Sequence, residues 1–206
     1  IRLVLAFAWL SPLVQPAHAD VILIVDTAAD VIANDGACSL REAIVAANSN
    51  ANYFGCIGSG GGFDLIEFSI GAGTPVIGLS SALPDITGPV EINGGPNRVE
   101  LMRASGPSFT GLRITGAAAS DSVIRNLVFQ AVAGAISLTN TSNVTIAGNY
   151  IGTNAAGTES FGLDSTLTSP KDSSRRTVAA RFPNVEFGSM RLPVTRPLFV
   201  VVAKPV

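Results

Sequence analysis

The residues that offer the most reactive chemistry lie together in one short stretch. Residues 38–42 supply a thiol, a hydroxyl, a guanidinium and a carboxylate; the four side chains are Cys38, Ser39, Arg41 and Glu42. A thiol or hydroxyl nucleophile needs a general base, which is most often an imidazole. His18 is the single histidine of the chain, and it lies near the start. The stretch is therefore interpreted either as a reactive site or as a structural motif.

The start of the chain predicts an export signal. Residues 3–14 form an apolar run that is too short to span a bilayer, and Ala17-His18-Ala19 is a small-x-small cleavage pattern. We interpret residues 1–19 as a signal peptide, with a buried strand or a membrane anchor as the alternative. Cleavage would remove the imidazole that Ser-His-Asp, Cys-His and histidine–metal chemistry require.

The two cysteines, Cys38 and Cys56, lie close together in the sequence. In an exported protein, two cysteines at such a short separation are more often a disulfide than two free thiols. We therefore predict a Cys38–Cys56 bond, with a reactive thiol at Cys38 as the alternative. In the chain-entropy model, such a loop stabilises the fold by roughly 3 kcal/mol.

The same stretch predicts a short helix with a defined start. Ser39 followed three residues later by Glu42 is a capping box, in which each side chain accepts a hydrogen bond from the backbone amide of the other residue. A catalytic Arg41–Glu42 ion pair is the alternative. Apolar residues then recur at helical spacing until Asn48 and Ser49, so the helix has about nine residues and must lie on a hydrophobic surface. The residues expected to face that surface are Leu40, Ala43, Ile44 and Ala47.

Short strands are predicted on both sides of the helix. Residues 21–27 form a β-branched run, and from Asp64 onward short apolar runs alternate with Gly, Pro, Asn and Ser. The intervals between these runs are too short for crossover helices, which excludes a doubly wound α/β sheet. A sandwich, a barrel or a solenoid remains.

Internal repetition favours the solenoid. Residues 123–129 align with residues 146–152 at an offset of 23, which places Asn126 over Asn149, and the run at Leu112 repeats at 24. Three short strands in such a period predict a parallel β-helix with coils about 4.8 Å apart. Asn126 and Asn149 are then expected to form a hydrogen-bonded turn ladder. Chance similarity within a Gly-rich sandwich is the alternative.

Two segments resemble a known family. "GACSLREAIVAANSN" at residues 36–50 resembles the CSLREA segment near the N-terminus of exported bacterial parallel β-helix repeat proteins, and "NVTIAGNYIGTNAAGT" at residues 143–158 is similar to their coils. The resemblance implies an all-β, right-handed parallel β-helix of the pectin-lyase-like superfamily, located outside the inner membrane. It implies no defined catalytic residue set, because most such chains look like adhesins, surface stalks or carbohydrate-contacting modules.

The chain divides into four predicted parts. Up to Asp164 it carries 6 Lys+Arg and 13 Asp+Glu, and from Ser165 it carries 7 and 2, so the net charge changes from −7 to +5. Five of the 12 prolines follow that point, which indicates a different kind of segment. The parts are a signal peptide (1–19), a cap with the short α-helix and the disulfide (20–63), β-helix coils (64–162), and a basic Pro-rich tail expected to be disordered or altered in reading frame (163–206).

Other candidate sites are weaker. An acidic loop from Asp26 to Asp35 has hard oxygen ligands for Ca²⁺, but it lacks EF-hand spacing and its residues are ordinary turn formers. We therefore predict no cofactor. The coil carboxylates are scattered, without the pair that glycoside hydrolysis needs. Four arginines could line one face of the coils: Arg98, Arg103, Arg113 and Arg125.

These features predict an exported structural or adhesive protein, not an enzyme, that presents a surface to polysaccharides or cell-surface molecules. The alternative is a pectin-lyase-like polysaccharide lyase or glycoside hydrolase whose catalytic coils lie beyond this chain; a non-functional fragment is a third interpretation. A formal net charge of −2 argues against nucleic acid as the partner. No membrane-spanning segment is expected in the mature chain.

Overall fold

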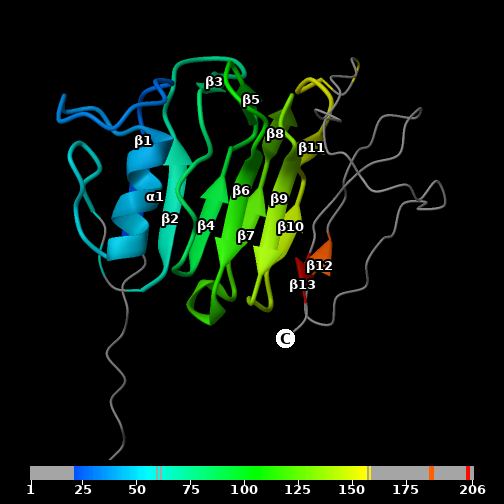
Figure 1. The fold of residues 1–206 in the computed structure, drawn as a ribbon. Coiled ribbons are helices and arrows are strands. Elements are labelled where there is room, and N and C mark those ends of the chain that lie inside the picture. Colours follow the sequence, from blue (N-terminus) through cyan, green and yellow to red (C-terminus); the bar gives the residue numbers. More distant parts are fainter. Residues whose placement is uncertain are drawn as a thin grey trace, which may run out of the picture.

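The computed structural model describes residues 21–58, 60, 62–156, 158, 186–187 and 203–204. The predicted signal peptide lies outside the described residues. So does the predicted tail, apart from two short strands. The elements, labelled in Figure 1, are β1 (Val21–Val25), α1 (Leu40–Ser49), β2 (Asp64–Phe68), β3 (Val76–Leu79), β4 (Val90–Asn93), β5 (Val99–Arg103), β6 (Thr110–Thr115), the 3₁₀ turn η1 (Ala117–Ala119), β7 (Val123–Arg125), β8 (Leu127–Gln130), β9 (Gly134–Thr139), β10 (Thr145–Ala147), β11 (Tyr150–Ile151), β12 (Glu186–Phe187) and β13 (Ala203–Lys204).

The strands form three parallel sheets, which are the sides of a β-solenoid of about three stacked turns. The first sheet has the order β1-β2-β4-β7-β10-β12, the second β11-β8-β5-β3, and the third β13-β9-β6. The described elements are thus almost all strands, with a single α-helix at the N-terminal end of the stack (Figure 1). The prediction of an all-β parallel β-helix with a short N-terminal helix is confirmed.

An aliphatic ladder fills the interior behind the first sheet. Successive side chains of a strand point to opposite faces, so one residue in two is directed inward. In parallel register, the inward residue of each strand lies directly over that of the preceding coil. Burying each such side chain contributes about 1.5–3 kcal/mol. The ladder consists of five fully buried residues: Leu23, Ile66, Ile92, Ile124 and Ile146.

The repeat length is confirmed in one sheet and wrong by one residue in another. Leu112 lies opposite Ile136 in the third sheet, at the predicted offset. In the first sheet Val123 lies opposite Thr145, so the offset there is 22 and not 23. Residues 122–130, which look like a single strand in the sequence, form two strands. Asn126 has a φ of 58° and turns the chain between β7 and β8.

This corner explains the error in the predicted register. Gly148, with a φ of 64°, occupies the corner of the next coil that Asn126 occupies in its own. Asparagine and glycine are the residues that adopt this left-handed conformation most readily, so either residue can occupy the corner. Aligning Asn126 with Asn149 therefore matched identical residues in different structural positions.

The Asn126–Asn149 ladder is accordingly replaced by two separate contacts. Asn126 donates from Nδ2 to Oδ1 of Asn93 at 2.9 Å, in the preceding coil. Asn149 is fully buried; its Oδ1 accepts from the Leu127 amide at 2.9 Å and its Nδ2 donates to the Ile124 carbonyl at 2.8 Å. Asn126 thus pairs with one asparagine of the preceding coil, whereas Asn149 bonds the backbone on both sides of the corner.

Candidate functional site

Helix α1 positions the reactive-looking stretch. Ser39 Oγ accepts from the Glu42 amide at 3.2 Å, and Glu42 Oε2 accepts from the Ser39 amide at 2.9 Å, which confirms the capping box. The helix ends at Ser49, slightly later than predicted, because Asn50 forms its C-cap with a φ of 49°. The predicted apolar stripe is buried in the core: Leu40, Ala43, Ile44 and Ala47.

The predicted disulfide between Cys38 and Cys56 is present. It joins the residue before the helix cap to a loop after the helix, where Tyr53 and Cys56 form an antiparallel bridge. Both cysteines are only 1% exposed and belong to the hydrophobic core. Since its sulfur is bonded and buried, Cys38 offers no thiol nucleophile in this structure.

The first coil of a solenoid presents unpaired backbone groups on the side that no earlier coil covers. In the first sheet, β1 pairs with β2 and covers that edge. Within the described residues, no strand precedes β3 in the second sheet or β6 in the third. The polar residues around the CSLREA-like stretch bond the backbone of the first coil at two places, residues 80–82 after β3 and residues 85–87 before β6.

Asn48 ends the third sheet in place of a strand. Its Nδ2 donates to the Asp85 carbonyl at 2.6 Å, and its Oδ1 accepts from the Thr87 amide at 2.8 Å. Ile86, between them, bonds the next coil through its own amide and carbonyl. A neighbouring parallel strand would satisfy the same two groups with one backbone carbonyl and one amide. The side-chain amide of Asn48 thus makes the two hydrogen bonds that one residue of a neighbouring strand would make.

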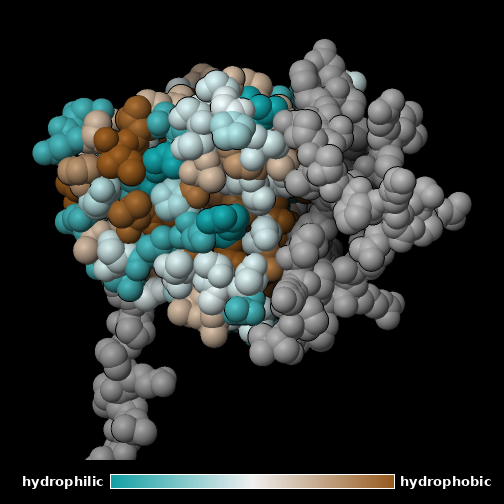
Figure 2. All heavy atoms as spheres, viewed as in Figure 1, coloured by the Kyte–Doolittle hydropathy of each residue, from teal (hydrophilic) through white to brown (hydrophobic). Residues whose placement is uncertain are grey.

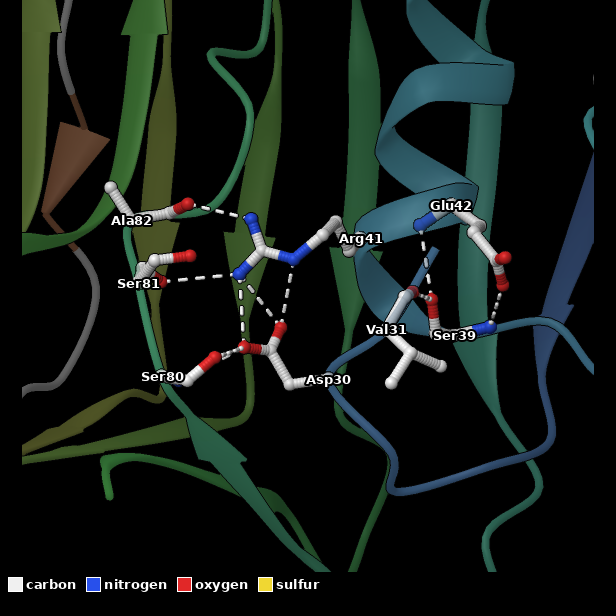
Figure 3. A network of polar contacts seen from close by, with 8 residues as sticks. All are labelled: Asp30, Val31, Ser39, Arg41, Glu42, Ser80, Ser81 and Ala82. Carbon is white, nitrogen blue, oxygen red and sulfur yellow. Dashed lines mark hydrogen bonds and ion pairs between the residues drawn. The ribbon is translucent and has the colours of Figure 1, made fainter. Parts of the chain in front are cut away.

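Arg41 and Asp30 bind the segment of the first coil that follows β3 (Figure 3). Arg41 donates to the Asp30 carboxylate at 2.7–3.0 Å, and the two side chains are 11% and 5% exposed. Arg41 also donates to the carbonyls of Ala82 at 2.6 Å and Ser81 at 3.2 Å. Asp30 Oδ2 accepts from the amide and the hydroxyl of Ser80, both at 2.9 Å. The ion pair therefore binds three consecutive residues of the first coil.

The capping-box residues also hold the loop that precedes the helix. Ser39 Oγ donates to the Val31 carbonyl at 2.7 Å, and Glu42 Oε1 accepts from the Ala33 amide at 2.7 Å. Glu42 is 1% exposed and is bonded through both carboxylate oxygens. Arg41 pairs with Asp30 and not with Glu42. The alternative of a catalytic Arg41–Glu42 pair is therefore not the arrangement found.

The acidic loop does not converge on a cation site. Asp26 accepts from a backbone amide at 2.8 Å, Asp30 belongs to the ion pair, and Asp35 accepts from a backbone amide at 3.0 Å. Within residues 21–58 and the other described residues, no group of three or more His, Cys, Asp and Glu is arranged to hold a metal ion.

The four arginines of the coils do not share one face. Arg125 lies on β7 in the first sheet, Arg103 on β5 in the second and Arg113 on β6 in the third. Arg98 precedes β5, and its guanidinium stacks over the Tyr150 ring at 3.9 Å. The chain passes through all three sheets in each coil, so arginines spread along the sequence are distributed around the solenoid.

Two of these arginines form equivalent ion pairs on different faces. Arg125 pairs with Glu91 and Arg113 with Asp85, in each case across adjacent coils. The arginine side chains are 45% and 52% exposed, so each pair contributes about 1 kcal/mol or less to stability. Their guanidinium groups remain available for external partners.

The sequence did not predict that Arg41 and Asn48 would bond the backbone of the first coil. They lie about two helical turns apart, which places them on one side of α1. A polar pair at that spacing beside an apolar stripe was the available signal. Its partners were not predictable, because they lie far along the chain, in the first coil of the solenoid.

Comparison with models of protein families, with curated proteins and with solved structures found no match to this chain. Within the described part of the chain, no helix is both long and apolar enough to cross a membrane. Fold and cap together define the class of protein: a parallel β-solenoid whose N-terminal edge is closed by a helix, an ion pair and an asparagine.

Replacing Asn48 with aspartate tests its role as a strand substitute. Aspartate keeps the acceptor for the Thr87 amide but loses the donor to the Asp85 carbonyl. We expect the free energy of unfolding to fall by about 1–3 kcal/mol in urea titrations. Asn97→Asp, at an exposed position, adds the same charge as a control and is expected to change stability by less than about 0.5 kcal/mol. Equal effects of the two substitutions would contradict the role.

Proposed function

We propose that this chain is an exported, non-catalytic β-solenoid of the CSLREA type, with a structural or adhesive role. The observation that supports it most is the use of the motif itself. Ser39 and Glu42 hold the loop that precedes the helix, and Arg41 bonds its buried partner Asp30 and the backbone of the first coil, so the polar groups of the motif have structural contacts. Export is supported by the disulfide, since such bonds form and persist in oxidising compartments.

We assign the binding surface to the outer face of the first sheet. This sheet has the most strands, and its outward residues form rows that repeat at about 4.8 Å from coil to coil. An extended polysaccharide or cell-surface polymer that runs along the solenoid would meet an equivalent row at each coil. One such row consists of Ile24, Glu67, Asn93, Arg125 and Ala147.

The outer face of the second sheet is less accessible for this purpose. The backbone amide of Ala155 donates to Glu100 Oε1 at 3.0 Å, so a later loop crosses β5. Arg98 covers the ring of Tyr150, which removes one flat surface for sugar stacking. These contacts favour the first sheet as the place where a glycan binds.

The two exposed ion pairs provide a matched test. The full chain is applied to immobilised neutral and acidic polysaccharides, and retention is measured together with new reducing ends and unsaturated products. We expect retention without turnover, weakened about tenfold by Arg125→Ala, because a hydrogen bond to a charged group is worth roughly 1.5–3 kcal/mol. Arg113→Ala removes the equivalent arginine from the third sheet and is expected to leave binding unchanged.

Different outcomes separate the alternatives. Accumulating product would favour the polysaccharide lyase or glycoside hydrolase interpretation over the adhesive one. Equal losses in both arginine variants would contradict the choice of the first sheet. Retention on none of the polysaccharides would count against a glycan as the partner.

A further inference from the structure

The disulfide encloses the part of the chain that closes the solenoid edge. Cys38 directly precedes the helix cap, and Cys56 lies in the loop that follows the helix. Arg41 and Asn48, which bond the first coil, both lie between the two cysteines. The disulfide therefore closes a loop that contains the whole of α1.

The loop after the helix depends on this bond. Tyr53 and Cys56 bond each other, and the Gly58 amide donates to Asn52 Oδ1 at 2.9 Å, so these hydrogen bonds stay within the loop. Gly55 packs so closely on the preceding segment that an added Cβ would lie 2.0 Å from the Ala37 carbonyl oxygen. A helix as short as α1 has little stability of its own, so it needs both of its ends held in place.

The exposed apolar side chains gather at this same end. All of the large hydrophobic residues that are exposed in the described structure belong to the cap or the first coil. Figure 2 shows apolar side chains on the surface over the cap region, among polar ones. Opening the cap would add the buried stripe of α1 to this surface and uncover the backbone groups at residues 80–82 and 85–87. The exposed residues are Ile22, Ile24, Val31, Ile32, Phe54, Ile57 and Val76.

We propose that capping depends on oxidation, so that the solenoid edge closes only when Cys38 and Cys56 have joined. A thiolate attacks a disulfide oxidant, and the second thiolate then displaces it; one S–S bond forms and the oxidant leaves as two thiols, having taken up two electrons and two protons. In the thiol form the coils persist, while the uncovered backbone groups at residues 80–82 and 85–87 associate with a second copy of this chain. Burial of both sulfur atoms then protects the bond from reductants.

The test compares the full chain refolded with oxidised glutathione, the same chain refolded in dithiothreitol, and the Cys38→Ser/Cys56→Ser variant. Hydrogen exchange is measured at the amides of Ser80 and Thr87, which the cap bonds, and at the amide of Thr145, which donates to the Ser122 carbonyl of the preceding coil at 2.9 Å. In both forms that lack the disulfide we expect exchange at the amides of Ser80 and Thr87 to be at least about tenfold faster, with Thr145 still protected. Light scattering is expected to show a mass that rises with protein concentration only in the two forms that lack the disulfide.

Each other outcome would overturn the proposal. Unchanged protection of Ser80 and Thr87 in the forms that lack the disulfide would show that the cap closes without the bond. Loss of protection at Thr145 to the same extent would show that the disulfide supports the whole fold and not the cap. A form without the disulfide whose cap is open but which stays monomeric at every concentration would exclude association with a second copy. This test is independent of the glycan assay, so either proposal can fail alone.

Discussion

Replacing Ile44 with aspartate is expected to lower the free energy of unfolding by at least about 4 kcal/mol, because it combines lost apolar burial with a buried, unpaired carboxylate. Ile44 is 1% exposed and belongs to the stripe that α1 packs against the solenoid core. The effect is measured by urea unfolding followed by circular dichroism, together with the soluble fraction after expression.

Val45→Asp is the matched control for this prediction. Val45 is the next residue of the same helix but lies outside the buried stripe and is only partly buried. The substitution adds the same charge and has a similar effect on helix propensity, so we expect a loss of about 1 kcal/mol. An unchanged unfolding midpoint for Ile44→Asp, or equal effects of the two variants, would return the motif to the candidate functional sites.

Arg41→Ala is expected to have the second largest effect, a loss of about 3–5 kcal/mol, because it leaves the Asp30 carboxylate buried without its partner. Asp30 is 5% exposed in the ion pair, so water does not replace the guanidinium freely. Arg41→Lys is expected to recover little of the loss, since an ammonium group cannot bond the carboxylate and the carbonyls of Ser81 and Ala82 in one plane. Urea unfolding of each variant measures these differences.

A double-mutant cycle separates the ion pair from general damage to the cap. Removing Asp30 together with Arg41 eliminates the buried charge, so the double variant is expected to be more stable than the sum of the single losses implies. Arg113→Ala, which breaks an exposed pair, should cost about 1 kcal/mol or less. Additive losses at Asp30 and Arg41 would contradict a coupled pair.

Features that depend on neighbouring residues were predictable from the sequence. The capping box needs only Ser39 and Glu42, three positions apart, and the disulfide closes a short loop around the helix. The apolar stripe follows from helical periodicity alone. The repeat in the third sheet was also visible, because alternating apolar residues of β6, Leu112 and Ile114, lie opposite Ile136 and Leu138 of β9.

Features that depend on how coils stack were not predictable in the same way. Val123 on β7 lies opposite Thr145 on β10, but it also lies opposite Glu91 on β4, which is much further away along the chain. With coils of such different length, sequence spacing does not reveal which side chains lie above one another. For this reason Asn126 contacts Asn93 and not Asn149, and the arginines are distributed over three sheets.

The sequence by itself determined the kind of structure: short strands in parallel coils, a capped helix and a disulfide, each encoded by local spacing. Only the tertiary structure decided what the CSLREA-like stretch does. Arg41 and Asn48 gain their roles from backbone groups of the first coil, which are brought to the helix by packing of its apolar stripe. The physical reason is that the unpaired backbone groups of the first coil are brought beside the helix only by folding, and Arg41 and Asn48 then bond them.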